Sequence, residues 1–254
     1  RALLHHDFKV MPNGNILAIA WESKSLGEAR TAGSAPEWTP EQGLWPDMIL
    51  EIERDGPYGA RVVWQWHAWD HLIQDTDPSL PNYGDPSEHP ERIDVNGGDR
   101  SLPEALTDER IAEFRRIGYV PSDDDEWSPT SDLMHTNAIA YNAELDQIAL
   151  SVPAFSEIWI IDHSTTTEEA AGHTGGRWGK GGDLLYRWGR PQAYGREQVP
   201  GLERSRQHDV RWIPEGMPGA GNLLLYANNV AGEDGMHSEI FELAPPTAAD
   251  GSYV

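Results

Sequence analysis

The hydrophobic positions of this chain fall in short runs, each bounded by Gly, Pro, Asn or Asp. Runs of about four to eight β-forming residues between such turn residues predict short strands. Three of these runs follow a histidine and form a strand, a turn and a second strand. They are "HHDFKVMPNGNILAIAWE" from His5, "MHTNAIAYNAELDQIALSV" from Met134 and "RQHDVRWIPEGMPGAGNLLLYANN" from Arg206.

Each histidine-led hairpin opens a longer unit in which the order of elements repeats. A strand containing Glu-Ile follows the hairpin, and a strand carrying an aromatic residue follows that. The additional strands are predicted at Asp47–Gly56, Ala60–Trp66, Ser156–Ser164, Gly182–Gly189 and Ser238–Pro246. The third unit stops before its last strand. Four-stranded units repeated along a chain are typical of an all-β fold, the β-propeller.

The spacing of the units locates an insertion. His6 and His135 are 129 residues apart, whereas His135 and His208 are 73 apart. The excess falls at about 67–132, which is polar and rich in proline, and a helix is predicted at Ser101–Tyr119. The expected organisation is one incomplete propeller domain over residues 1–254, with a loop and helix insertion. Since known propellers have at least four blades, we expect further sequence, a partner or a second copy to supply the others.

Composition restricts the classes of partner and chemistry. The chain has 254 residues, 11 Trp, no Cys and a net charge of -23. Such an acidic chain without a visible basic patch is not expected to bind nucleic acid. The lack of cysteine excludes disulfides and thiolate metal sites. No apolar run approaches the roughly 20 residues of a membrane span.

The repeated histidines suggest a site. In a propeller, equivalent positions of the innermost strands converge on a central channel, so His6, His135 and His208 are expected around one axis. The alternative is that a histidine at a strand head only bonds a backbone carbonyl and shapes a turn.

The three hairpins, together with "SEIWIIDHSTTTEEAAGHTGGRWGKGGDLLYRWG" from Ser156, resemble the bacterial arylsulfotransferase (aryl-sulfate sulfotransferase) family. The resemblance covers most of the chain outside the insertion. It implies a six-bladed propeller with a channel active site, and a periplasmic or secreted location.

The resemblance also implies a reaction. A histidine takes a sulfuryl group from an aryl sulfate and passes it to a phenolic acceptor, without PAPS or another nucleotide cofactor. The family's "QHD" motif places the nucleophile at His208, and the earlier repeats add His6 and His135. Asn137 matches a polar side chain at the sulfate. The neighbouring His5 and Asp209 are also expected to contact substrate.

One position departs from the family pattern. An arginine is expected shortly after the second histidine's strand, where this chain has Ser151-Val152-Pro153. That arginine would be the strongest anion clamp, and Arg187 or Arg211 could replace it. Two alternatives therefore stay open: a propeller scaffold without transfer chemistry, and a metal-dependent hydrolase that uses the three histidines.

Other motifs allow a functional and a structural interpretation. His67 and His71 have the i, i+4 spacing of a helical metal site, but their context favours a loop. Asp94, Asn96 and Asp99 have calcium-like spacing without the closing Glu of an EF-hand, so calcium is a minor hypothesis. The glycine-rich loop around His173 could bind an anion, but its pattern matches no P-loop and favours a long connection.

Tryptophans on the predicted strands are expected to pack between blades. They are Trp64, Trp66, Trp159, Trp188 and Trp212. One or two aromatic residues near the channel could also stack on an aromatic substrate.

Overall fold

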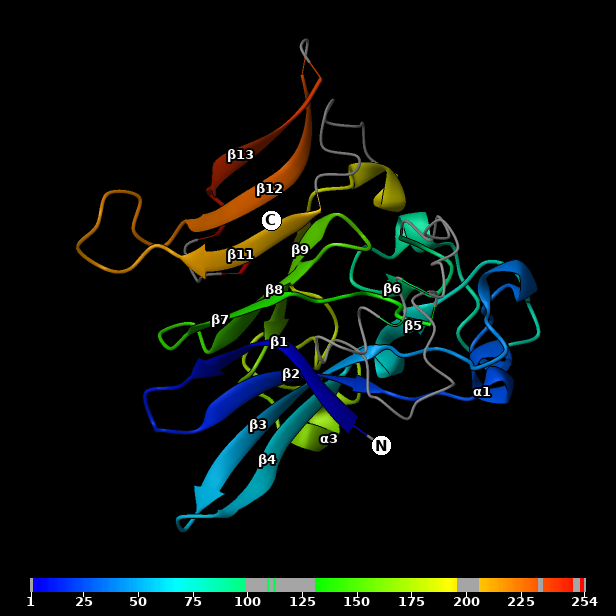
Figure 1. The fold of residues 1–254 in the computed structure, drawn as a ribbon, viewed down its shortest axis with the longest axis horizontal. Coiled ribbons are helices and arrows are strands. Elements are labelled where there is room, and N and C mark those ends of the chain that lie inside the picture. The colour runs from blue at the N-terminus through cyan, green and yellow to red at the C-terminus, as the bar shows by residue number, and fades with distance from the viewer. Residues whose placement is uncertain are drawn as a thin grey trace.

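The fold is all-β, as the alternation of apolar and turn residues predicts. The computed structural model describes residues 2–98, 109, 112, 131–195, 206–232, 235–248 and 252–253. Three antiparallel sheets account for most of the regular structure, and each sheet corresponds to one histidine-led unit (Figure 1).

The first two sheets have four strands each, joined in sequence order as meanders. The first consists of β1 (Ala2–Val10), β2 (Ile16–Glu22), β3 (Asp47–Asp55) and β4 (Gly59–His67). The second consists of β7 (Ala138–Asn142), β8 (Gln147–Val152), β9 (Glu157–Asp162) and β10 (Tyr186–Trp188).

The third sheet has three strands among the described residues. They are β11 (Gln207–Trp212), β12 (Leu223–Gly232) and β13 (Gly235–Leu243). This agrees with the prediction that the third unit stops before its last strand.

Strand β10 is shorter than the predicted run Gly182–Gly189. The amide of Gly182 donates to the carbonyl of Gly172, and that of Leu184 donates to the carbonyl of Glu91. The first part of the run therefore closes a loop, and only the last part pairs with β9.

The histidine-led strand is the edge strand of its sheet in all three units. Strand β7 contacts both β1 and β11, so these three edges lie together at the centre of the molecule while the sheets extend away from it (Figure 1). This arrangement brings the histidine-containing strand heads into one region.

Two apolar clusters hold the sheets together. The larger joins the first two sheets and contains Trp64, Trp66 and Trp159; the smaller joins the second and third, with Trp188 and Trp212 packed against it. Burial of such side chains stabilises by about 25 cal/mol per Å² of apolar surface. The predicted packing of tryptophans between sheets is confirmed.

Short helices and turns occupy the connections. They are α1 (Leu26–Thr31), η1 (Pro36–Trp38), α3 (Thr167–Ala170) and η4 (Pro191–Tyr194). Ser25 and Glu28 form a capping box at α1, and Thr166 and Glu169 form one at α3. Nothing among the described helices has the length and apolar character needed to cross a membrane.

The first part of the insertion is described and is more structured than the predicted loop. It contains η2 (Ala68–His71), β5 (Leu72–Ile73), η3 (Pro86–Glu88) and β6 (Ile93–Asp94), and β5 pairs with β6 in parallel. The helix predicted at Ser101–Tyr119 lies outside the described residues, apart from Glu109 and Ala112, so it stays a prediction. Asp99 lies outside them as well.

Candidate functional site

Two of the three predicted histidines are in direct contact. The ring centroids of His6 and His135 are 4.5 Å apart, with an interplanar angle of 77°. His6 lies on β1, and His135 lies three residues before β7. The first and second sheets therefore each contribute one imidazole to the same place.

A left-handed backbone kink accompanies each histidine, although His6 lies within β1, His135 lies before β7 and only His208 lies at the start of its strand. The φ angles are +54° at His6, +57° at His135 and, directly after His208, +57° at Asp209. Such angles are uncommon for residues other than glycine and concentrate at functional sites. The register of β1 and of β11 also shifts here, which is the signature of a bulge that redirects side chains.

Asp132 holds His135 in place. Its Oδ2 lies 2.6 Å from His135 Nδ1, and its Oδ1 accepts the backbone N–H of His135 at 3.0 Å. Burial by itself would lower the pKa of His135, but the hydrogen bond and charge of Asp132 outweigh it, with help from Asp47. The pKa of His135 is therefore raised, and the imidazolium form is favoured.

His6 has the opposite preference. Burial, followed by the neighbouring charges of His135 and His5, lowers the pKa of His6 to about 4. Asp132 opposes this shift but does not overcome it. At neutral pH His6 is therefore neutral, whereas its neighbour His135 binds a proton more readily than a free histidine does.

His5 lies behind this pair and is tightly packed. Its ring stacks on Trp21 with centroids 4.0 Å apart, and its Nε2 lies 3.3 Å from Oδ1 of Asp47. Asp47 is buried, and its Oδ2 accepts the backbone N–H of Thr136 at 2.7 Å. Asp47 thus links the first sheet to the segment that carries His135.

His208 is exposed on β11 and lies close enough to His6 for its charge to lower the pKa of that residue. Its Nδ1 is 3.0 Å from the carbonyl oxygen of Arg206 and 2.8 Å from Nδ2 of Asn228. The carbonyl accepts from a protonated Nδ1, whereas Nδ2 of Asn228 donates to an unprotonated Nδ1, so the two contacts favour different tautomers. A proton on Nδ1 leaves the lone pair on Nε2. That tautomer presents a nucleophilic nitrogen.

Asn137 connects the second and third sheets. Its Nδ2 donates to the carbonyl of Gln207 at 3.1 Å, and the hydroxyl of Ser151 donates to the same carbonyl at 2.9 Å. Asn137 therefore fixes the residue before His208. Its predicted contact with substrate stays a prediction.

The sequence analysis missed three residues that shape this site: Asp132, Asp47 and Trp21. Trp21 donates from Nε1 to Asp132 Oδ1 at 3.2 Å and is the aromatic residue that stacks on His5. Asp132 lies three residues before His135, and an acid so close to a candidate histidine was the available signal.

The i, i+4 pair His67 and His71 does not converge on one site. His67 Nδ1 lies 3.1 Å from Glu22, whereas His71 Nδ1 lies 2.8 Å from Asp183.

The segment with calcium-like spacing uses its polar side chains for hydrogen bonds within the protein. The Oδ1 of Asn96 accepts the backbone N–H of Ala35, and Asp94 accepts the N–H of Asn96.

Comparison with known proteins identifies the family. The family model described as Arylsulfotransferase (ASST) matches residues 1–239. The chain belongs to the arylsulfotransferase family. None of the curated proteins matches it significantly.

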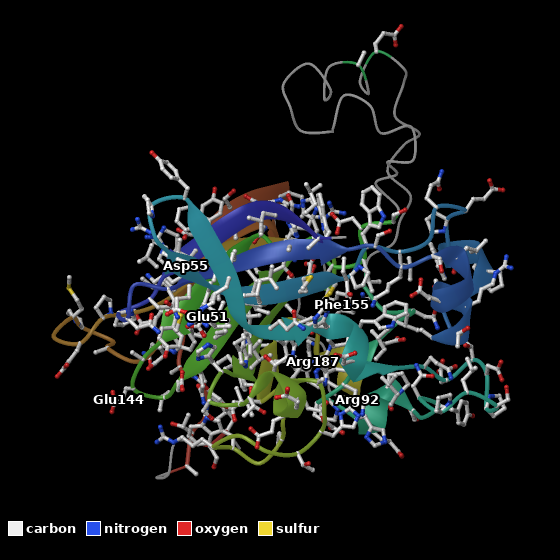
Figure 2. All side chains as sticks on the ribbon, turned by 90° about the horizontal axis from the view of Figure 1, so that it is seen from below. Glu51, Asp55, Arg92, Glu144, Phe155 and Arg187 are labelled. Atoms are coloured by element: carbon white, nitrogen blue, oxygen red, sulfur yellow. The ribbon has the colours of Figure 1, made fainter. Side chains whose placement is uncertain are left out.

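Membership in this family makes the missing arginine important, and the structure locates both suggested replacements. Arg187 donates from Nε and Nη2 to the buried Glu157, at 3.0 and 2.6 Å, and lies beside the segment of Arg92 (Figure 2). Arg211 donates to Asp209 at 2.6 Å on the exposed face. Both are committed to carboxylates.

A third cation lies nearer the histidines. The positive charge of Arg206 acts on His135 and lowers its pKa, against the larger effect of Asp132. Arg206 also supplies the carbonyl that contacts His208. Arg206, which lies two residues before the third histidine, therefore acts electrostatically on the second.

Proposed function

We propose that this protein is an aryl-sulfate sulfotransferase that moves a sulfuryl group from a phenolic sulfate ester to a phenolic acceptor. The observation that carries the proposal is the contact between His6 and His135 beside the strand of His208. The two contacting imidazoles have opposite protonation preferences. Sulfuryl transfer through a covalent intermediate needs a neutral nucleophile, here His208, and a separate proton donor, here His135. It also needs donors to the sulfuryl oxygens, a role proposed for the neutral His6.

The proposal includes the architecture. The three sheets are blades of a β-propeller, and the strand heads of β1, β7 and β11 line its channel. Supporting this, each sheet is a meander whose histidine-led strand is the inner edge. Further blades from additional sequence or a second copy would complete the ring.

The proposed first step uses His208 as nucleophile. Nε2 attacks sulfur, an N–S bond forms, and the bond from sulfur to the phenolic oxygen breaks. His135, held as imidazolium by Asp132, gives its proton to the departing oxygen. A sulfohistidine and a neutral phenol result.

The second step reverses the first with a new phenol. Its oxygen attacks sulfur, its proton returns to His135, and the N–S bond breaks to release the new aryl sulfate and neutral His208. No nucleotide or PAPS takes part. His5, Asn137 and Asp209 are proposed to shape the substrate contacts, and Trp21 supplies an aromatic surface.

Arg206 is proposed as the anion-binding residue. A guanidinium can hold two sulfate oxygens at once and so position the ester. It also offsets, close to the site, the unfavourable field of a chain with net charge -23. By analogy with the family, we propose a periplasmic or secreted location.

The test is detection of the intermediate. The protein is incubated with a nitrophenyl sulfate, quenched and analysed by peptide mass spectrometry. We expect a sulfuryl adduct on the peptide containing His208, and transfer to added phenol. His208→Asn removes both, whereas the matched control His237→Asn, an exposed histidine on β13, retains them.

Other outcomes contradict the proposal. Binding of aryl sulfates without adduct or transfer would favour the scaffold alternative. Release of sulfate to water that depends on an added metal would favour the hydrolase alternative. An adduct on another histidine would overturn the assignment of His208.

A further inference from the structure

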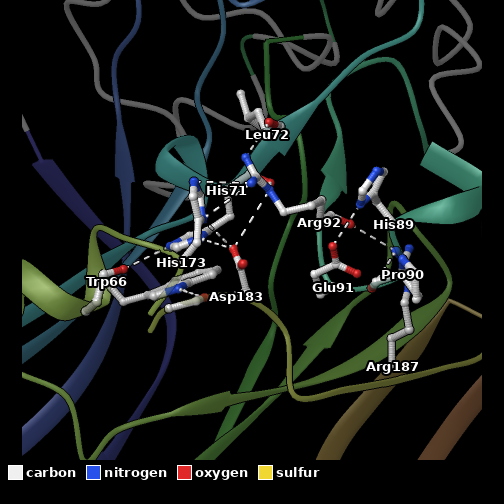
Figure 3. Close-up of polar contacts among 12 residues, drawn as sticks. Trp66, His71, Leu72, His89, Pro90, Glu91, Arg92, His173, Asp183 and Arg187 are labelled. Carbon is white, nitrogen blue, oxygen red and sulfur yellow. Dashed lines mark hydrogen bonds and ion pairs between the residues drawn. The ribbon is translucent and has the colours of Figure 1, made fainter. Parts of the chain in front are cut away.

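A second cluster of chemically active side chains lies at the junction of the insertion with the second sheet. It consists of His71 on η2, and of His173 and Asp183 in the loop between α3 and β10 (Figure 3). The Oδ1 of Asp183 lies 2.8 Å from Nδ1 of His71 and 2.9 Å from Nδ1 of His173. Two imidazole nitrogens thus face one carboxylate oxygen.

Hydrogen-bond counting shows why His71 suits a cation. Its Nε2 lies 2.9 Å from the carbonyl oxygen of Ala170, which can only accept, so Nε2 carries a proton. A neutral His71 then has a lone pair on Nδ1, and this lone pair faces the carboxylate of Asp183. Either a second proton or a metal ion must lie between these two acceptors.

The surroundings fix the ring of His71 in this orientation. The side chain is fully buried and stacks on Trp66, with centroids 5.7 Å apart and planes within 6°. A Cβ on Gly182 would come within 2.6 Å of Nε2, so glycine is needed beside the ring. A metal-ligating histidine characteristically donates its other N–H to a backbone carbonyl, as His71 does to Ala170.

His173 provides the accessible side of the cluster. Its side chain is 48% exposed, which leaves room for water to complete a coordination shell. Arg92 lies close by, with Nη1 at 3.3 and 3.2 Å from the two ring nitrogens of His173. The lone pairs of the two ring nitrogens point in different directions, so a single N–H group of Arg92 cannot donate a hydrogen bond to both.

Arg92 itself is anchored by backbone. Its Nε and Nη2 donate to the carbonyls of His71 and Leu72, at 3.1 and 3.0 Å. Its positive charge opposes a metal ion, but Asp183 offsets one charge locally and the chain as a whole carries -23. The net field therefore attracts cations to the protein.

We propose that His71, His173 and Asp183 bind one divalent transition-metal ion of the zinc class. Two imidazole nitrogens and one carboxylate oxygen are ligands that zinc accepts. With metal bonds of about 2.0–2.1 Å, tetrahedral ligands lie about 3.3 Å apart, so each imidazole nitrogen needs to move roughly half an ångström away from Oδ1 of Asp183. The ion would fasten the insertion to the loop of the second sheet.

The experiment is a Co²⁺ titration of the full chain after treatment with EDTA. We expect one equivalent to bind, with visible ligand-field absorption that Zn²⁺ abolishes. We also expect Zn²⁺ to raise the midpoint of thermal unfolding, because an ion that binds only the folded state stabilises it.

Two variants locate the site. His173→Ala removes an exposed ligand, and it should weaken Co²⁺ binding at least tenfold and cancel the thermal shift. In EDTA its unfolding midpoint should match the parent's, which shows that it folds. His89→Ala, an exposed histidine paired with Glu91, is the control and should bind as the parent does. Absence of stoichiometric binding, or equal binding by His173→Ala, overturns the proposal.

Discussion

At the scale of single residues, His6 and His135 show how environment separates two identical side chains. Both are partly surrounded by protein, which disfavours the charged imidazole, although His6 keeps an exposed surface. Only His135 has a carboxylate within hydrogen-bond distance, so its pKa is raised while that of His6 is lowered to about 4. A pair with separated pKa values is suited to distinct acid and base roles.

The pKa of His6 predicts an acid-sensitive contribution to stability. The unfolded chain binds this proton near pH 6.5, and the folded chain binds it only near 4. The free energy of unfolding therefore falls as pH decreases from 6.5 to 4, and His6→Gln should make this decrease shallower. The measurement is urea unfolding from pH 4 to 7.5.

His135 has the opposite sign and provides an internal check. Because its pKa is raised, its contribution is complete below pH 6.5 and is lost as pH rises through the folded value. His6→Gln should leave the pH dependence of the free energy of unfolding above pH 6.5 unchanged. If the free energy of unfolding decreases equally below pH 6.5 in the parent and in His6→Gln, the lowered pKa of His6 is contradicted.

The proposed anion contact predicts a loss of activity when the guanidinium of Arg206 is removed. Arg206→Gln should reduce kcat/KM for an aryl sulfate by about 10²-fold, the usual cost of removing one donor to a developing charge. Arg61→Gln is the control, since Arg61 pairs with the exposed Glu53 on a distant hairpin. Steady-state kinetics test both variants, and equal effects would contradict a specific role for Arg206.

At the scale of elements, the strands were predictable and their side-chain partners were not. The middles of β8, "IAL", and of β9, "IWII", are continuous apolar runs because both strands are fully buried, and buried polar residues flank these runs. The helices α1 and α3 were missed, although capping boxes mark their starts. Asp47 on β3 reaches His5 on β1 within the first sheet and reaches Thr136 across to the second unit, and no local pattern reports such contacts.

The sequence repeat is what allowed the three histidines to be predicted as candidate site residues. His6, His135 and His208 recur at equivalent points of three units, so their meeting follows from symmetry of the chain. Arg187 instead forms an ion pair with the buried Glu157 of β9, and this partner determines its role. Sequence alone could not distinguish an arginine that binds ligand from one that neutralises an interior acid.

The pairing on β9 and β10 gives a stability prediction. Burial raises the pKa of Glu157, and Arg187 opposes that shift. Arg187→Met leaves the carboxyl without its cation and should cost about 3–5 kcal/mol in the free energy of unfolding. The double variant Glu157→Gln/Arg187→Met should recover part of this loss. Urea unfolding measures both, and a loss below about 1 kcal/mol for the single variant would refute the role.

At the scale of the whole molecule, charge and open edges dominate. The chain carries -23, and the outer faces expose apolar side chains, among them Phe8 on β1 and Ile240 on β13. In the proposed propeller, further blades would cover the exposed apolar groups at the two ends of the sheet array. Both features imply that the surroundings of the protein contribute to its stability.

The charge predicts a dependence on salt. Repulsion among excess carboxylates destabilises the compact state, and salt screens it, with a Debye length of about 10 Å at 0.1 M and about 3 Å at 1 M. The midpoint of thermal unfolding should therefore rise as NaCl increases from 0.01 to about 1 M. Differential scanning calorimetry tests this, and a midpoint that falls with salt would mean that local ion pairs outweigh the net charge.

The contact between His6 and His135 has a mechanical consequence. One imidazole belongs to the first sheet and the other to the second, so any molecule held by both becomes a bridge across the seam between them. Binding would therefore oppose separation of the two sheets. Separation of the sheets would release the ligand while each sheet stays folded. The free energy of ligand binding and the free energy needed to separate the two sheets are therefore linked.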